Sequence, residues 1–69
     1  MKLITLLHIC SDKKYRIRKG IDYKNTGEVT DVVYSGIPGD VPEELLSYMV
    51  LAFDRDNDWL DVVVGESQW

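Results

Sequence analysis

Apolar and polar positions divide the chain into short segments of two kinds. In residues 3–10 the apolar side chains of Leu3, Leu6, Leu7 and Cys10 recur at the three- and four-residue spacing of one helix face. A strand here would carry apolar residues on both faces, so we predict a helix of about two turns. The pattern leaves the strand open as the alternative.

Four later segments have the character of β-strands. In residues 14–19, Tyr15 and Ile17 alternate with Arg16 and Arg18, as a half-buried strand requires. The other predicted strands are residues 28–34, 50–53 and 59–64. Residues 20–27 and 54–58 carry the Asn, Asp and Gly residues of turns, and we predict that they connect two hairpins.

Between the two predicted hairpins, residues 36–50 contain both prolines and the clearest helix start. Asp40 and Glu43 have the spacing of a capping box, and Pro42 is tolerated in a first helical turn. With Val41 as the cap instead, the boundary shifts by one residue. We therefore predict a second short helix, with an apolar face built from Leu45, Leu46 and Met49.

These elements predict an α+β fold, a four-stranded and mainly antiparallel sheet with two short helices. We expect the 69 residues to form one small domain, residues 1–69, with residues 65–69 as a loose tail. In the last hairpin, Leu51 and Phe53 are expected to face the core with Leu60, Val62 and Val64, and Val50, Trp59 and Val63 to lie on the other side. This is more apolar surface than a one-sided sheet needs, so either a helix or another copy of the chain covers part of it. Because the domain is near the lower size limit, we expect a homo-oligomer.

Charge is distributed unevenly along the chain. The net charge is −4, yet residues 1–24 hold seven Lys and Arg against two acids, whereas residues 25–69 hold one Arg against ten acids. The acidic majority argues against general nucleic-acid binding, while the basic segment is compact enough to hold a small anion. The single cysteine, Cys10, and the lack of a signal sequence or membrane span predict a cytoplasmic protein with no membrane partner.

The strongest candidate ligand site is this basic strand. Arg16, Arg18 and Lys14 can hold phosphates, and Tyr15 or Tyr34 can stack on a base. The competing interpretation is an exposed strand face whose charges either discourage pairing with another strand edge or meet Glu28 and Asp31 across the hairpin. A second candidate is an acidic face that docks on a basic protein, formed by Asp54, Asp56, Asp58 and Asp61 and extended by Glu43 and Glu44.

No arrangement of residues indicates catalysis, a metal or another cofactor. The alternating aspartates of residues 54–58 resemble the start of a calcium loop, but Trp59 and Gly65 stand where that loop needs glycine and glutamate. His8 and Cys10 are too few ligands for zinc, and one histidine on an apolar segment suggests no nucleophile–base pair. We therefore expect a protein that is not an enzyme.

Several short motifs resemble a class of very short proteins from phages and mobile elements of gut bacteria. The resemblance covers about residues 15–64, and its most characteristic part is Asp-Val-Pro-Glu-Glu-Leu-Leu at residues 40–46. It also includes Val-Val-Tyr-Ser-Gly at residues 32–36 and Leu-x-Val-x-Val at residues 60–64. The resemblance implies an accessory protein that acts in the host cytosol and antagonises host antiviral defence by binding.

That context leaves three hypotheses. The first is an oligomer that sequesters a small anionic, nucleotide-like signal through the basic strand. The second is an acidic nucleic-acid mimic that docks on a host defence protein. The third is a structural or assembly oligomer held together by its aromatic and valine surface.

Overall fold

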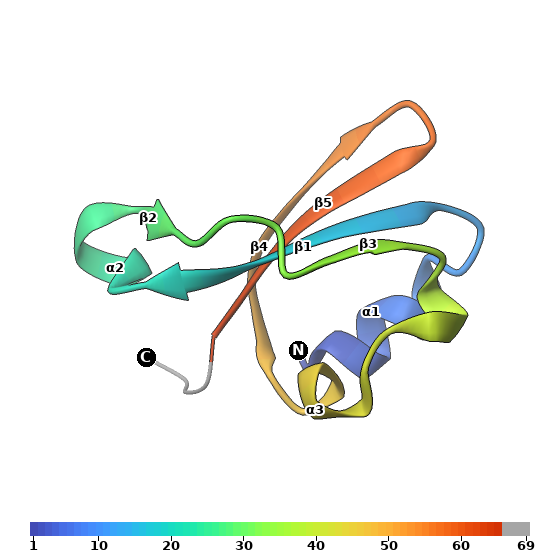
Figure 1. Ribbon diagram of the computed structural model, residues 1–69, viewed down its shortest axis with the longest axis horizontal. Helices are drawn as coiled ribbons and strands as arrows, with labels where there is room; N and C mark the ends of the chain where they lie inside the picture. The colour runs from blue at the N-terminus through green and yellow to red at the C-terminus, as the bar shows by residue number, and fades with distance from the viewer. Residues whose placement is uncertain (66–69) are drawn as a thin grey trace.

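The computed structural model describes residues 1–65 of the chain, and the predicted loose tail lies outside them except for Gly65. The elements follow in the order α1 (Leu3–Ile9), β1 (Lys14–Ile21), α2 (Tyr23–Thr26), β2 (Glu28–Val29), β3 (Tyr34–Gly36), the 3₁₀ turn η1 (Pro38–Asp40), α3 (Glu43–Leu46), β4 (Met49–Asp56) and β5 (Trp59–Gly65). The α+β class with short helices is confirmed (Figure 1).

The sheet has five strands rather than four, because the second predicted strand is divided. Its order is β2-β1-β5-β4, and β3 also pairs with β1. Gly20 pairs with Val29 but Ile17 pairs with Tyr34, so residues 30–33 contain two more residues than a regular ladder would hold. Thr30 stabilises the interruption, since its Oγ1 accepts from the Lys19 N–H at 3.1 Å and donates to the Asp31 carbonyl at 2.9 Å.

Parallel pairing of β1 with β5 is the central feature of the topology. Residues Lys14 to Lys19 pair in register with Trp59 to Val64, whereas β1–β2, β1–β3 and β4–β5 are antiparallel. The sheet is therefore mainly antiparallel, but its two middle strands run in the same direction. The basic segment of the sequence lies directly beside part of the acidic one.

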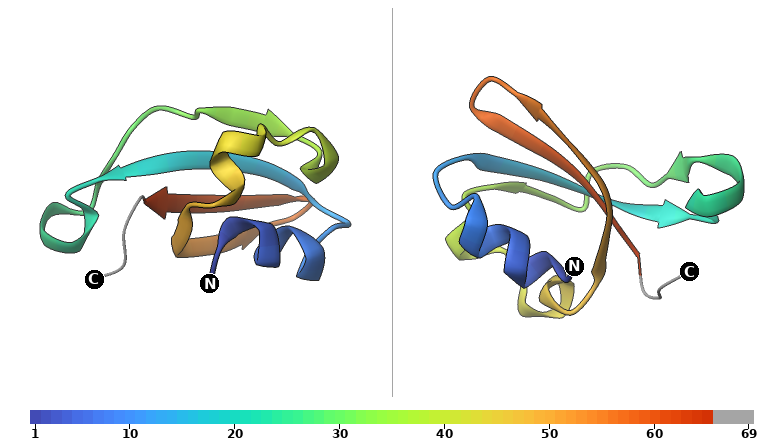
Figure 2. Two further views of the ribbon diagram at one scale, coloured as in Figure 1. Left: turned by 90° about the horizontal axis from the view of Figure 1, so that it is seen from below. Right: turned by 180° about the vertical axis from the view of Figure 1, so that it is seen from behind.

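One side of the sheet holds the hydrophobic core. Both α1 and α3 lie on this side (Figures 1 and 2), and α1 directs Leu3, Leu6 and Leu7 inward, as its spacing predicts. The buried apolar side chains are Leu3, Leu6, Leu7, Cys10, Tyr15, Ile17, Val41, Leu45, Leu60, Val62 and Val64.

A bulge in β4 changes the expected facing of its side chains. The register shifts between Val50 and Ala52, so Val50 pairs with Val64 and packs against the core, contrary to the prediction for Val50. Phe53 pairs with Val62 on the core side, as expected, but its side chain is 51% exposed. Val50 and Phe53 are three positions apart and would lie on opposite faces of a regular strand. The extra residue of the bulge allows both to lie on the core side.

The predicted capping box does not form. Pro42 is the N-cap of α3, no side chain caps it, and the helix is only four residues long. Val41, with φ −60° and ψ 129°, is extended. A residue that precedes proline avoids the helical region, so a helix cannot run from Asp40 through Val41 to Pro42.

Gly27 is the position where glycine's conformational freedom matters most clearly. It ends α2 at φ 72°, and a Cβ there would meet no atom within 4 Å. Gly27→Ala should lower the free energy of unfolding by about 1 kcal/mol, because an L-residue is strained in the left-handed region. Gly39→Ala is the matched control, since its Cβ is equally unobstructed and no positive φ is required. Urea unfolding of both variants tests this, and equal losses would contradict it.

Candidate functional site

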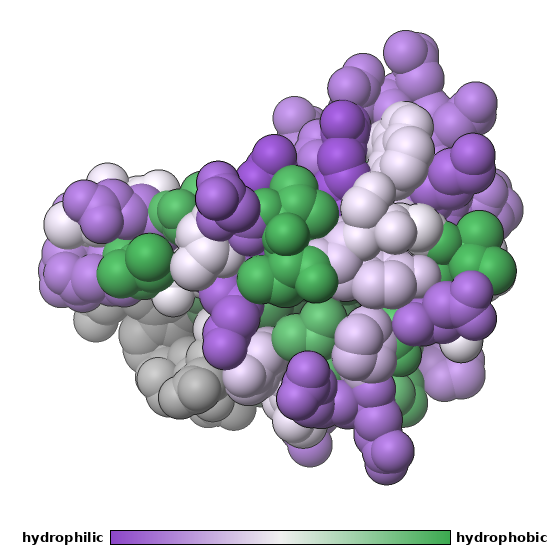
Figure 3. Space-filling view, viewed as in Figure 1, coloured by the Kyte–Doolittle hydropathy of each residue, from purple (hydrophilic) through white to green (hydrophobic). Residues whose placement is uncertain are grey.

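The face of the sheet opposite the core, called the open face below, carries charged side chains in cross-strand rows. Register places Asp56, Trp59 and Lys14 in one row, Asp54, Asp61 and Arg16 in the next, and Ala52, Val63 and Arg18 in the third. Paired residues share a face, so all nine project on the same side. Three cations and three carboxylates meet there, and their formal charges cancel. In Figure 3 hydrophilic side chains gather over the β4–β5 hairpin.

Asp61 is the hub of the ion pairs on the open face. Its Oδ1 lies 2.9 Å from Arg16 Nε and 3.6 Å from Arg18 Nη1, and its Oδ2 accepts from Arg16 Nη2 at 3.3 Å. Arg16 Nη2 also lies 3.4 Å from Asp56 Oδ2. The buried Arg16 Nε and Asp61 Oδ1 pair with one another by charge, not through a well-aligned hydrogen bond. The basic strand is thus neutralised mainly by Asp61 of β5, and not by Glu28 and Asp31.

Trp59 is the aromatic centre of the open face. Arg16 Cζ lies 4.9 Å from the centroid of the indole ring and Lys14 Nζ lies 5.7 Å from it. Both distances allow cation–π attraction, which is strongest for tryptophan. The hairpin that carries Trp59 is also fixed to the start of β1, because Lys13 Nζ donates to the Asn57 carbonyl at 3.0 Å and Lys14 N donates to the Asp58 carbonyl at 2.9 Å.

A shallow hollow lies beside Arg18 on the open face. Its volume is about 170 Å³, and its walls include Arg18, Tyr23, Asp54 and Asp61. Pockets that enclose small molecules usually measure about 300–1,000 Å³. The hollow is therefore small for a nucleotide, and two of its walls are carboxylates.

Neither Tyr15 nor Tyr34, the two tyrosines predicted to stack on a ligand of the basic strand, lies on the open face. Tyr15 has no exposed surface, and its hydroxyl donates to the Leu6 and Cys10 carbonyls at 3.2 Å and 2.7 Å. Tyr34 pairs with Ile17 on the core side, its hydroxyl donates to the Ile37 carbonyl, and burial followed by nearby Asp40 raises its pKa. Stacking by Tyr15 is excluded, and Tyr34 is on the wrong side to act with Arg16.

The predicted acidic face is not one surface. Asp54, Asp56 and Asp61 share the open face with the cations, and Asp58 lies in the turn that follows Asp56. Glu43 and Glu44 lie in α3, which precedes β4, whereas Asp54 and Asp56 lie at the far end of that strand (Figures 1 and 2). Eight strand residues span about 25 Å, so the glutamates do not extend this face. Within residues 1–65, no three His, Cys, Asp or Glu residues are grouped to hold a metal ion.

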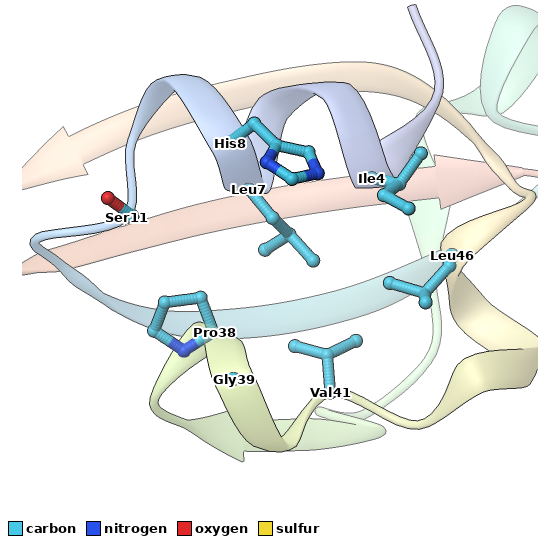
Figure 4. A pocket seen from close by; sticks show the side chains of 8 residues that line it. All are labelled: Ile4, Leu7, His8, Ser11, Pro38, Gly39, Val41 and Leu46. Carbon is cyan, nitrogen blue, oxygen red and sulfur yellow. The ribbon is translucent and has the colours of Figure 1, made fainter.

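A larger groove lies on the core side, between α1 and the segment from Pro38 to Leu46. It measures about 410 Å³ and is lined mainly by apolar side chains, with His8 and Ser11 as polar members (Figure 4). His8 is exposed, as are Ile4 and Ile9 of the same helix. None of the basic-strand residues lines this groove.

Trp59 is the aromatic member of the open face, and neither sequence-based site included it. Strand alternation does place it on the same side of β5 as Asp61, and that was the available signal. Its closeness to Arg16 and Lys14 depends on the parallel pairing of β1 with β5, which the sequence pattern does not reveal.

Comparison with known proteins gives no relative. No protein-family model matches the chain, and neither a curated protein nor a solved structure matches it. Among the described residues, no helix is both long and apolar enough to cross a membrane.

Proposed function

We propose that this protein is a non-enzymatic binding protein that acts by docking the open face onto a protein partner. The observation that carries the proposal is Trp59 beside Arg16 and Lys14, in a network of paired charges on a face that neither α1 nor α3 covers. Tryptophan and arginine are enriched among the residues that dominate binding energy in protein interfaces.

A protein partner fits this face better than a small anion does. Arg16 already contacts Asp61 through two nitrogens and Asp56 through one of them, so a phosphate would have to compete with both carboxylates. Asp54 lies beside Asp61 in the same row, and it would repel an anion further. A protein surface with alternating charges would extend the network without displacing it.

The resemblance to short phage proteins gives the proposal its biological context. The partner would be a component of host antiviral defence, and docking would block its action. Net charge −4 favours a basic partner surface, as in the hypothesis of a nucleic-acid mimic. The contacts, however, come from a mixed-charge face and not from an acidic one.

Plating of a defence-sensitive phage on hosts that carry individual defence systems tests this function. Expression of the protein should restore plating on at least one host, and Trp59→Ala should reduce the restoration tenfold or more. A hot-spot truncation weakens binding by about 2 kcal/mol, or about thirtyfold. Ile37→Ala, which removes a 52% exposed apolar side chain outside the open face, is the control. Circular dichroism must show both variants folded, and full activity of folded Trp59→Ala would contradict the proposal.

Native mass spectrometry with a nucleotide panel separates docking from sequestration. Docking predicts no retained nucleotide and a defence-restoring activity that is sensitive to Trp59. Retention of a nucleotide that is lost in the Arg16→Glu, Arg18→Glu double variant would select sequestration. Self-association without any activity against defence would select the structural hypothesis.

A further inference from the structure

The outer edge of β4 is only partly covered. Residues Met1 to Leu3 occupy its beginning, where Leu3 N donates to the Tyr48 carbonyl at 2.9 Å, Val50 N donates to the Met1 carbonyl at 2.8 Å, and Lys2 bridges to Met49. From residue 51 to residue 56, the described part of the chain places no strand against this edge. Open strand edges are templates for pairing with another chain.

Arg55 shows which main-chain groups of β4 point outward from the sheet. Its N–H donates to the Asp54 carboxylate at 3.0 Å, so it points away from the ladder with β5. Phe53, two residues earlier in the strand, then directs its own N–H and carbonyl outward as well. A second strand would find these groups in position and would displace the Asp54 carboxylate from Arg55.

Apolar side chains are concentrated beside the same edge. Met1 and Phe53 are each 51% exposed, and together with Val50, Leu51 and Ala52 they line a hollow of about 320 Å³. Single exposed apolar residues are ordinary on a soluble protein, whereas here several lie together along an unpaired strand edge.

Charge and strand length select one register for pairing with a second copy. We require the core sides of the two sheets to lie on the same side of the joined sheet. The two-fold axis of the antiparallel pair must then pass between one residue of β4 and the same residue of the second copy, and this residue is called the centre. A centre at Asp54 sets two carboxylates opposite one another, which is unfavourable. A centre at Ala52 sets Asp54, Arg55 and Asp56 of one copy against Val50, Met49 and Tyr48 of the other, along the part of the edge that residues 1–3 already occupy. A centre at Phe53 pairs no two carboxylates, and only Asp56, the last residue of β4, reaches Val50 at the end of the strand beside Lys2.

We propose that two copies of this chain associate through the β4 edges, antiparallel and centred on Phe53. Each Phe53 then packs against its counterpart on the core side of the joined sheet. The outward main-chain groups of the two strands bond to one another. The open face is not consumed, so this dimer is independent of the docking function proposed above.

Sedimentation and light scattering over a concentration series test the dimer. Phe53→Lys sets two ammonium groups at the two-fold axis and should raise the dimer dissociation constant thirtyfold or more. Ile37→Lys is a matched control, since Ile37 is 52% exposed and lies outside β4, and it should dimerise like the original chain. Trp59→Ala should also dimerise normally. A monomeric original chain at millimolar concentration, or an unchanged constant for Phe53→Lys, would overturn the proposal.

Cysteine cross-linking tests the register without relying on affinity. Phe53→Cys should form a covalent dimer on mild oxidation, because residues opposite one another in a hydrogen-bonded antiparallel pair have Cα atoms about 5.5 Å apart, within disulfide reach. The original chain is the control, since its only cysteine, Cys10, is buried. Asp54→Cys should cross-link far more slowly, as it faces Ala52 of the other copy. Equal or faster cross-linking of Asp54→Cys would overturn the register.

Discussion

Tyr15→Ala should leave most of the protein unfolded at 25 °C. Tyr15 is fully buried, and its hydroxyl ties β1 to the carbonyls of Leu6 and Cys10 at the end of α1. Truncation of a buried aromatic residue to alanine costs about 3–5 kcal/mol. A core of this size supplies about 3–5 kcal/mol in total, so little stability would remain.

Tyr15→Phe separates the ring from the hydroxyl. This variant keeps the packing and takes the hydroxyl donor from the Cys10 carbonyl, while the Leu6 carbonyl still accepts from the Cys10 N–H, so it should remain folded and lose about 1–3 kcal/mol. Urea unfolding monitored by circular dichroism measures both variants, with Ile37→Ala as an exposed control. A Tyr15→Ala protein within about 1 kcal/mol of the original would show that β1 does not depend on this contact.

Stability should fall steeply between pH 10 and pH 12. Burial, and to a smaller extent the charges of Cys10 and Asp12, raises the pKa of Tyr15 to about 12. The unfolded chain releases this proton near the ordinary tyrosine pKa of about 10. Below that pH the stabilisation is complete, and it is lost as the pH rises toward the folded value. The loss from this residue is about 2–3 kcal/mol.

Comparison with Tyr15→Phe isolates this contribution from the other groups that titrate at alkaline pH. The free energy of unfolding of both proteins should be measured in urea at half-unit steps from pH 8 to about pH 12. The original protein should lose more stability than Tyr15→Phe over the upper two units. Parallel curves would show that folding does not raise the pKa of the Tyr15 phenol.

Local sequence pattern was sufficient for α1 and for the composition of the core strands. Leu3, Leu6 and Leu7 recur at helical spacing and are buried, and Tyr15 and Ile17 alternate with Arg16 and Arg18 as the strand requires. Such predictions succeed because each element must place its apolar side chains on one side. The same pattern did not reveal the break at residues 30–33 or the bulge at Leu51, because both depend on what the neighbouring strand bonds to.

Asp61 shows why the candidate site could not be assembled from the sequence. Alternation along the chain placed Asp61 and Arg16 correctly within their own strands. Nothing local indicated that these two residues, 45 positions apart, would lie side by side on neighbouring strands. The hairpin partners expected for the basic strand, Glu28 and Asp31, belong to the next predicted strand, whereas the observed partner, Asp61, comes from the other end of the chain.

The sequence by itself determined the α+β class, the helix at the N-terminus and the sides of β1 and β5 on which polar residues project. These properties follow from the spacing of apolar residues and from the rule that apolar side chains are buried. Only the tertiary structure decided that β1 runs parallel to β5. That pairing sets Arg16 and Arg18 against Asp61 and beside Trp59, and turns the separate basic and acidic segments into one neutral face, since the charges lie within reach only once the two strands share a ladder.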